Sequence, residues 1–210
     1  MKRVLLFVCT SLLFLNLKAQ DIEKSKAFDM VIKNKTAIGL SDEDVFNSIV
    51  SSAYQSYSSG LSMVYLQQTY KGLPVFNQLQ SLAFKNDMLY SNFGERISDI
   101  KSKVNAISIF PSITPEVAVT KALQSKKIFN FNSLHPTTLI PGRKFDFGKC
   151  GVAYENITAE LLWVPVLDGK QVILCWQIYL VPNSSSDYWM IRVDANSNNI
   201  ISENNLTVFC

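Results

Sequence analysis

The sequence predicts an α+β protein of two lobes, each a helix packed on an antiparallel β-meander. Two observations carry this prediction. A helix-type segment precedes a run of strand-type segments, and the same order is repeated in the second half of the chain. With 210 residues, 48% of them apolar and 18% charged, the chain has an ordinary globular composition. We place the two lobes at residues 20–106 and 107–210, after a distinct segment at residues 1–19.

Residues 1–19 are typical of a secretory signal peptide. Lys2 and Arg3 form a basic start, an apolar run follows, and Ala19 precedes Gln20 at the expected cleavage position. The segment is short for a membrane span, so we expect a secreted or periplasmic protein with no membrane association after its removal. Twenty Lys and Arg, minus the three in this segment, leaves 17 bases against 17 acids. That neutral balance removes the main support for nucleic-acid binding.

In the first lobe, residues 39–60 predict a helix. Ser41 is the candidate N-cap, Asp44 follows three residues later as in a capping box, and apolar residues then recur at helical spacing. A metal site at the acidic run 42–44 is a weaker interpretation than a charged first helical turn, because no other ligand cluster accompanies it. Alternation and turn residues predict three strands, at 63–70, 75–84 and 88–93.

In the second lobe, residues 113–127 predict a helix with Thr114 as N-cap and Pro115 at the first helical position. Residues 129–151 are expected to be rich in loops. Four strands are then expected, at 159–166, 171–181, 187–195 and 199–204. Three aspartates fall at turns or strand ends, where this residue bonds the backbone: Asp168, Asp187 and Asp194.

No catalytic constellation stands out. His135 is the only histidine, which leaves neither a two-histidine zinc site nor a histidine triad with a spare base, so we interpret it as a solvated loop residue. Trp163, Trp176 and Trp189 occur one per strand. They could form a sugar-stacking platform, but their apolar neighbours favour a sheet face packed against the helix.

Three cysteines remain after removal of the signal: Cys150, Cys175 and Cys210. Cys150 could be a nucleophile, but a disulfide or structural role is favoured. An odd count in an exported protein implies a free thiol or a partner elsewhere. Either Cys210 pairs with Cys150, or the chain is the front part of something longer.

Residues 64–91 resemble the fungalysin/thermolysin propeptide (FTP) domain. That family has an apolar-Tyr-Leu-Gln-Gln strand, a Gly-Leu-Pro-Val turn and an aromatic-Asn pair. The matching positions, called here the signature residues, are Tyr65, Leu66, Gln67, Gln68, Gly72, Pro74, Val75 and Asn77. Met63 stands where many members carry His, so no role of that His is carried over. Strand alternation places Gln67 and Gln68 on opposite faces, so the signature identifies a module rather than a pair of reacting groups.

The second half is similar to the PepSY-like lobe that closes these prodomains, which implies a cystatin/PepSY-like fold. The resemblance implies the prosegment of a secreted zinc metalloprotease, which assists folding of the catalytic domain and occupies its cleft. The zinc and its HExxH helix would lie downstream of Cys210, so these residues need no cofactor and carry no activity of their own.

The expected partner is the catalytic domain of a fungalysin-like metalloprotease, in cis or in trans. By analogy, a contact segment approaches its cleft: Asn204, Asn205, Leu206, Thr207, Val208 and Phe209. The alternative is a free-standing exported protease inhibitor or binding module of the same fold. A third and weaker hypothesis is a carbohydrate-binding module that uses the tryptophans.

Overall fold

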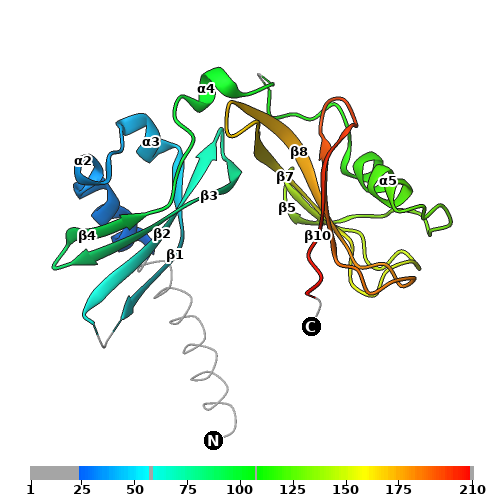
Figure 1. The fold of residues 1–210 in the computed structure, drawn as a ribbon, viewed down its shortest axis with the longest axis horizontal. Helices are drawn as coiled ribbons and strands as arrows, with labels where there is room; N and C mark the ends of the chain where they lie inside the picture. The colour runs from blue at the N-terminus through cyan, green and yellow to red at the C-terminus, as the bar shows by residue number, and fades with distance from the viewer. Residues whose placement is uncertain (1–23, 57–58, 107, 209–210) are drawn as a thin grey trace, which may run out of the picture. The chain divides into compact units, whose positions relative to one another are not determined.

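The computed structural model describes residues 24–56, 59–106 and 108–208. Over these residues ten strands join one mixed sheet, accompanied by a few short helices (Figure 1), which confirms the α+β class. Backbone contacts divide the chain into two compact units. Unit 1 holds the described residues up to Gly72 together with Asn77–Ile97, and unit 2 holds Leu73–Phe76 and the described residues from Ser98 onward. Because one strand contributes to both units, the two separate lobes and their boundary stay predictions.

Unit 1 begins with a helix at residues 24–33, followed by two short helices and four strands. Its elements are α2 (Lys35–Ile38), α3 (Asp42–Phe46), β1 (Ser48–Ser56), β2 (Leu61–Tyr70), β3 (Leu73–Lys85) and β4 (Met88–Phe93). These strands are neighbours in the order β1, β2, β3, β4. Two residues, Lys71 and Gly72, join β2 to β3, and both have positive φ, at 49° and 79°. A type I′ hairpin turn requires this conformation at both positions. The predicted β2 and β3 hairpin and the third strand are therefore confirmed.

The helix predicted over residues 39–60 is wrong beyond its first turns. Its start is confirmed: the Asp44 amide donates to Ser41 Oγ at 3.1 Å, and the Ser41 amide donates to Asp44 Oδ2 at 3.0 Å. The helix ends at Phe46, however, and the following residues form β1, which pairs with β2. Serine and β-branched residues are poor helix formers, and pairing with eight residues of β2 outweighs an apolar spacing that fits either structure.

The core of unit 1 lies between the first helix and the sheet. Ala27 and Val31 of that helix pack with Val64 and Leu66 of β2 and with the buried end of β3. The cluster of buried residues is Ala27, Val31, Ile38, Leu40, Val64, Leu66, Leu82 and Phe84. Helix and hairpin are thus held together by apolar burial, the main favourable contribution to folding.

Unit 2 carries most of the remaining sheet. Its elements are α4 (Ile100–Lys103), α5 (Pro115–Ser125), β5 (Thr137–Ile140), β6 (Lys144–Asp146), β7 (Thr158–Val166), β8 (Gln171–Leu180), β9 (Trp189–Asp194) and β10 (Ile200–Asn205). The last four strands follow one another as antiparallel neighbours, β6 joins the other side of β7, and Val75 of β3 pairs with Trp163 in parallel. Thr114 caps α5 as predicted. The strands β5 and β6 were not predicted, because they are short and interrupted by Pro141 and Gly142.

Two of the three tryptophans lie in the core of unit 2. Trp163 and Trp176 are fully buried, and Trp176 Nε1 donates to the Ile113 carbonyl at 2.7 Å, just before α5. Trp189 is half-buried, with the Lys126 ammonium 3.4 Å from its ring centre. The predicted packing role is therefore confirmed for Trp163 and Trp176, and the three side chains do not form a common exposed platform.

Candidate functional site

The signature residues occupy β2, the turn and the start of β3, and their apolar members are core residues. Leu66 is buried in the unit 1 cluster, whereas Val75 is buried in unit 2, where it faces Trp163 in the strand register. Asn77 adopts the left-handed conformation, with φ of 57°, within β3. Asparagine tolerates this conformation better than most residues. The Asn at this position is thus explained by backbone geometry, at the point where β3 passes from one unit to the other.

The two signature glutamines make separate hydrogen bonds. Gln67 Nε2 donates to the carbonyls of Gln68 and Gln78, at 2.8 and 3.0 Å. Gln68 is 2% exposed, and its amide group bonds both backbone groups of Ile97: Nε2 donates to the Ile97 carbonyl at 2.8 Å, and Oε1 accepts from the Ile97 amide at 2.9 Å. Gln68 therefore fixes the segment that leaves β4. No sequence pattern indicates this contact, because the two residues are 29 positions apart.

A polar network beside Gln68 joins the helix cap to the sheet. The Arg96 guanidinium lies 3.2 Å from Asp44 Oδ1 and donates to Ser48 Oγ and Gln80 Oε1 at 3.2 and 3.3 Å. Burial acts to raise the pKa of Asp44, but the hydrogen bonds from Ser41 and the charge of Arg96 outweigh it, so this pKa lies below its usual range. The acidic run is therefore the start of a helix whose aspartates pair with cations, since Asp42, two residues before Asp44, pairs with Lys35.

We expect Asp44→Asn to lower the free energy of unfolding by about 1 kcal/mol at pH 7, the size of a typical helix cap. The contribution of the partly exposed ion pair is screened and small. Because the folded-state pKa is depressed, the stabilisation is present above the unfolded-state pKa of about 3.9 and is lost as pH falls through the folded-state value. Urea titrations of both proteins between pH 7 and pH 3 measure this. A difference between them that stays constant across the range would contradict the assignment.

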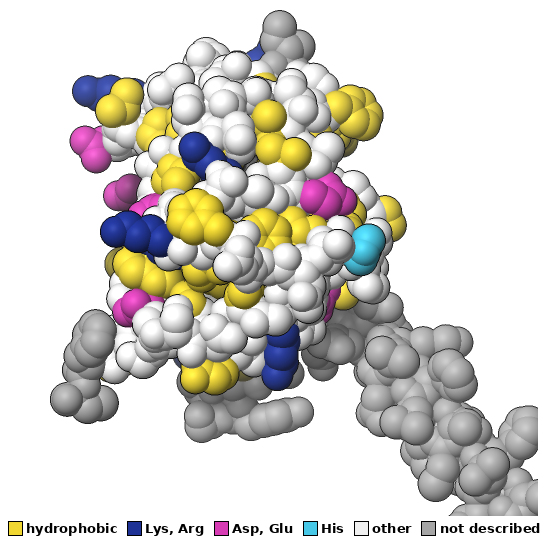
Figure 2. All heavy atoms as spheres, turned by 90° about the vertical axis from the view of Figure 1, so that its right-hand side faces the viewer, with side chains coloured by type: hydrophobic (Ala, Val, Ile, Leu, Met, Phe, Trp, Pro, Cys, Tyr) yellow, Lys and Arg dark blue, Asp and Glu magenta, His cyan; other side chains and the backbone are white. Residues whose placement is uncertain are grey.

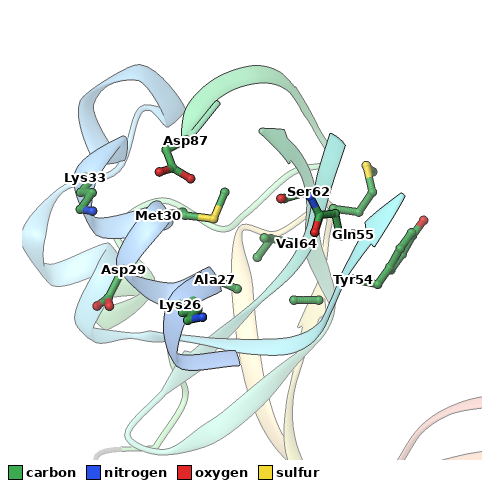
Figure 3. Close-up of a pocket in the computed structure, with 12 residues that line it drawn as sticks. Lys26, Ala27, Asp29, Met30, Lys33, Tyr54, Gln55, Ser62, Val64 and Asp87 are labelled. Carbon is green, nitrogen blue, oxygen red and sulfur yellow. The ribbon is translucent and has the colours of Figure 1, made fainter. Parts of the chain in front are cut away.

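A cavity of about 420 Å³ lies beside the signature hairpin, between the first helix and strands β1 and β2 (Figure 3). Met30 extends from the helix toward the strands that carry Gln55 and Val64. The lining combines apolar side chains with polar and charged ones: Lys26, Ala27, Asp29, Met30, Lys33, Ala53, Tyr54, Gln55, Ser62, Met63, Val64 and Asp87. Met63, at the position where the resembling family carries His, is one of them. The lining contains neither histidine nor cysteine.

The residues weighed for chemistry do not come together. His135 is exposed in a loop, and across the described ranges no three His, Cys, Asp or Glu side chains gather closely enough to hold a metal ion. Cys150 is half-buried, and its thiol donates to the Phe147 carbonyl at 3.1 Å. Burial raises the pKa of the Cys150 thiol, the opposite of what activates a nucleophile. Cys210 lies outside the described residues, so its pairing with Cys150 stays a prediction.

Cys175 should resist alkylation in the folded protein. It is fully buried in β8, and burial, helped by the charge of Asp194, raises its pKa to about 12. At pH 8 almost none of it is the reactive thiolate. We expect iodoacetamide to leave Cys175 unmodified until the protein is unfolded, as read by mass spectrometry of its peptide. Alkylation of Cys175 in the folded state as fast as in the unfolded state would contradict its placement.

Of the aspartates predicted to bond the backbone at turns, Asp194 does so, whereas the Asp187 carboxylate bonds side chains. Asp194 Oδ1 accepts from the amides of Asn196 and Ser197, at 2.8 and 3.1 Å. Asp187 accepts from Asn205 and Ser185, at 2.8 and 2.9 Å, and these bonds lower its pKa. Both carboxylates therefore serve local structure.

The contact segment lies along β10 and just beyond it. Asn204 and Asn205 end the strand, and the Leu206 amide donates to the Tyr188 carbonyl at 2.7 Å. Thr207 Oγ1 accepts from the Tyr188 amide at 2.8 Å. Val208 is 83% exposed. The segment is therefore attached to unit 2 up to Thr207. Phe209, like the cleavage position at Ala19 and Gln20, lies outside the described residues.

Neither the distribution of surface charge on the face drawn in Figure 2 nor the hydropathy of the described helices indicates a particular kind of partner. On the face drawn in Figure 2, basic and acidic side chains are interspersed rather than gathered by sign. None of the helices in the described part of the chain is long and apolar enough to cross a bilayer.

Comparison with known proteins gives one match to a protein family. Residues 49–95 match the family described as the Fungalysin/Thermolysin Propeptide Motif. This range covers almost all of β1 to β4 and contains every signature residue, so the resemblance seen in the sequence is confirmed for residues 49–95. No curated protein matches the sequence.

Two solved structures are similar over most of the chain. The C-terminal domain of YpeB from Bacillus megaterium is 14% identical with a TM-score of 0.37, over 90% of this chain and 67% of that one. A protein of Clostridium difficile 630 that is assigned as a lipoprotein is 10% identical with a TM-score of 0.28, over 80% of this chain and 90% of that one. The PepSY-like assignment of the second half stays a prediction.

Proposed function

We propose that this chain is the propeptide module of a secreted fungalysin-like zinc metalloprotease, acting as an intramolecular chaperone and inhibitor of the catalytic domain. The observation that supports this most directly is the propeptide-motif match over residues 49–95. The matched residues form a hairpin sheet in which the signature glutamines Gln67 and Gln68 make internal hydrogen bonds. In this proposal the module acts by binding another protein rather than by chemistry of its own.

The docking surface in this proposal is the β10 end of the sheet. Among the described strands β10 pairs only with β9, so its outer edge offers backbone groups to an extended segment of a partner. The contact segment that follows is uncharged from residue 204 to residue 208. Its exposed Val208 and partly exposed Leu206 supply apolar side chains for the subsites of a peptidase cleft.

Zinc enters this proposal only through the partner, since the metal belongs to the catalytic domain. The protein is exported through its signal peptide and meets that domain in cis or in trans. The alternative, a free-standing exported inhibitor of the same fold, uses the same surface. The codons that follow Cys210 distinguish the two, because a precursor encodes an HExxH helix further along.

Refolding of the catalytic domain tests the chaperone role. The unfolded catalytic domain of a fungalysin-like protease from the same organism is diluted into buffer with zinc, either with residues 20–210 or with an equal mass of serum albumin. After the module is removed, we expect a higher yield of active peptidase from the first mixture. Equal yields from the two mixtures would contradict the chaperone role.

A further inference from the structure

A row of polar side chains crosses unit 2 from strand to strand. The register pairs Lys144 with Glu160, Glu160 with Gln177, Gln177 with Arg192, and Arg192 with Ser202. The row thus runs through β6, β7, β8, β9 and β10. Apolar side chains flank it on the same face of the sheet: Leu162, Val164, Ile173, Cys175 and Phe76. Polar residues placed in such a setting need specific partners, because burial without partners is costly.

Arg192 is the buried cation of this row, and none of the described residues gives it a carboxylate partner. It is 5% exposed, and no carboxylate in the described part of the chain lies within ion-pair distance of its guanidinium. The row's own acid, Glu160, is occupied by Arg143 at 2.7 Å and by Lys144 at 3.2 Å. Burial lowers the pKa of Arg192, as expected for a charge removed from water.

The neutral partners of Arg192 all come from unit 2. Its Nε donates to Gln177 Oε1 at 3.0 Å, and one terminal nitrogen donates to Ser202 Oγ at 3.0 Å and to Asn204 Oδ1 at 3.4 Å. The other terminal nitrogen lies 3.4 Å from Met190 Sδ. The guanidinium stacks 3.7 Å from the ring centre of Phe76, next to the signature residue Asn77. One planar group therefore connects β3, β8, β9 and β10.

We propose that Arg192 is a positioning residue that fixes β10 and the contact segment for docking into the partner's cleft. The docking part of this inference rests on the proposed function. A buried charge without a counter-ion is a poor way to stabilise a core, and hydrophobic replacements of buried ionic groups are often tolerated. Its hydrogen bonds reach Ser202 and Asn204, the side chains at the base of the contact segment. Lysine cannot replace it, because a single ammonium lacks the planar fork that reaches several acceptors while stacking on a ring.

Amide hydrogen exchange in the free module tests the positioning role without any partner. In Arg192→Met, we expect the Leu206 amide, which bonds to Tyr188, to exchange about tenfold faster, as for loss of one charge-assisted hydrogen bond. The Ile178 amide in the core should change much less. The control is Lys144→Met, which removes a cation of the same row that contacts Glu160 and not β10, and should leave Leu206 unchanged.

Two further variants cover the case in which Arg192→Met does not fold. The double variant Ser202→Ala with Asn204→Ala removes the two side-chain acceptors that Arg192 has on β10. Both residues are more exposed than Arg192, so the double variant should fold more readily. It should accelerate exchange of the Leu206 amide by a similar factor. Asn204→Asp gives the guanidinium a carboxylate and should slow it. Unchanged Leu206 exchange in both the Arg192 and the double variant, or equal acceleration at Leu206 and Ile178, would overturn the positioning role.

Inhibition of the catalytic domain tests the docking part. If the wild-type module inhibits, Arg192→Met should raise its inhibition constant about tenfold, and Lys144→Met should not change it. Faster Leu206 exchange with an unchanged inhibition constant would overturn the docking part. If the wild-type module fails to inhibit, the proposed function fails, and the exchange result still decides whether Arg192 fixes β10.

Discussion

Replacing Trp176 with alanine should lower the free energy of unfolding by about 3–5 kcal/mol. Trp176 is 1% exposed, packs edge-to-face on Phe145 with ring centres 5.8 Å apart, and donates to the Ile113 carbonyl. The substitution leaves a cavity under α5 and an unpaired carbonyl, and both effects destabilise the fold. A loss of this size is a large part of the total stability of a typical domain. Urea unfolding followed by circular dichroism measures it.

Trp189→Ala is the matched control for this prediction. Trp189 is half-buried and contacts the Lys126 ammonium, so its replacement should cost about 1–2 kcal/mol. Equal losses of unfolding free energy for the two variants would contradict the distinction between the fully buried Trp176 and the half-buried Trp189.

Gly94→Ala should cost about 2–5 kcal/mol. Gly94 has φ of 105°, and an added Cβ would lie 2.4 Å from the Leu79 carbonyl oxygen and 3.1 Å from Gln80 Cα. Both contacts are backbone atoms of β3, so the clash cannot be relieved by rotating a side chain. Strained backbone contributes about 1–3 kcal/mol and overpacking a similar amount. Urea titration of the variant gives the change in unfolding free energy.

Gly72→Ala separates the two contributions to that cost. Gly72 has φ of 79° but no atom within 4 Å of an added Cβ, so only the left-handed conformation is penalised, by about 1–2 kcal/mol. Gly94→Ala should therefore be clearly the more damaging change. A smaller loss at Gly94 than at Gly72 would show that β3 and the segment after β4 do not approach as closely as described.

Local chemistry allowed the turns, the caps and most strands to be predicted from the sequence. The capping box at Ser41 and the cap at Thr114 depend on residues three positions apart, and the Lys71–Gly72 turn depends on two adjacent residues. Strand β1 was mistaken for helix because its apolar spacing fits both structures, and only its pairing with β2 decides between them. Long-range pairing is not visible in a single sequence.

For the candidate site, only the signature residues could be predicted from the sequence, not the contacts that they make. The residues from Tyr65 to Asn77 could be recognised, and their range agrees with the family match. The partners that explain them could not be predicted: Gln68 bonds Ile97, and Phe76 stacks on Arg192 more than a hundred residues away. The role of Arg192 could not be predicted either, because it depends on the strand register that places Arg192 opposite Gln177 and Ser202.

Titration of a catalytic domain with the purified module tests the central claim most directly. Residues 20–210 are added in increasing amounts to the zinc-loaded catalytic domain of a fungalysin-like protease from the same organism, and peptidase activity is measured. A thermolysin-type protease from an unrelated organism and an unfolded sample of the module serve as controls. The proposed function predicts a saturable loss of activity that requires the folded module. Full activity at a large excess of folded module would contradict it.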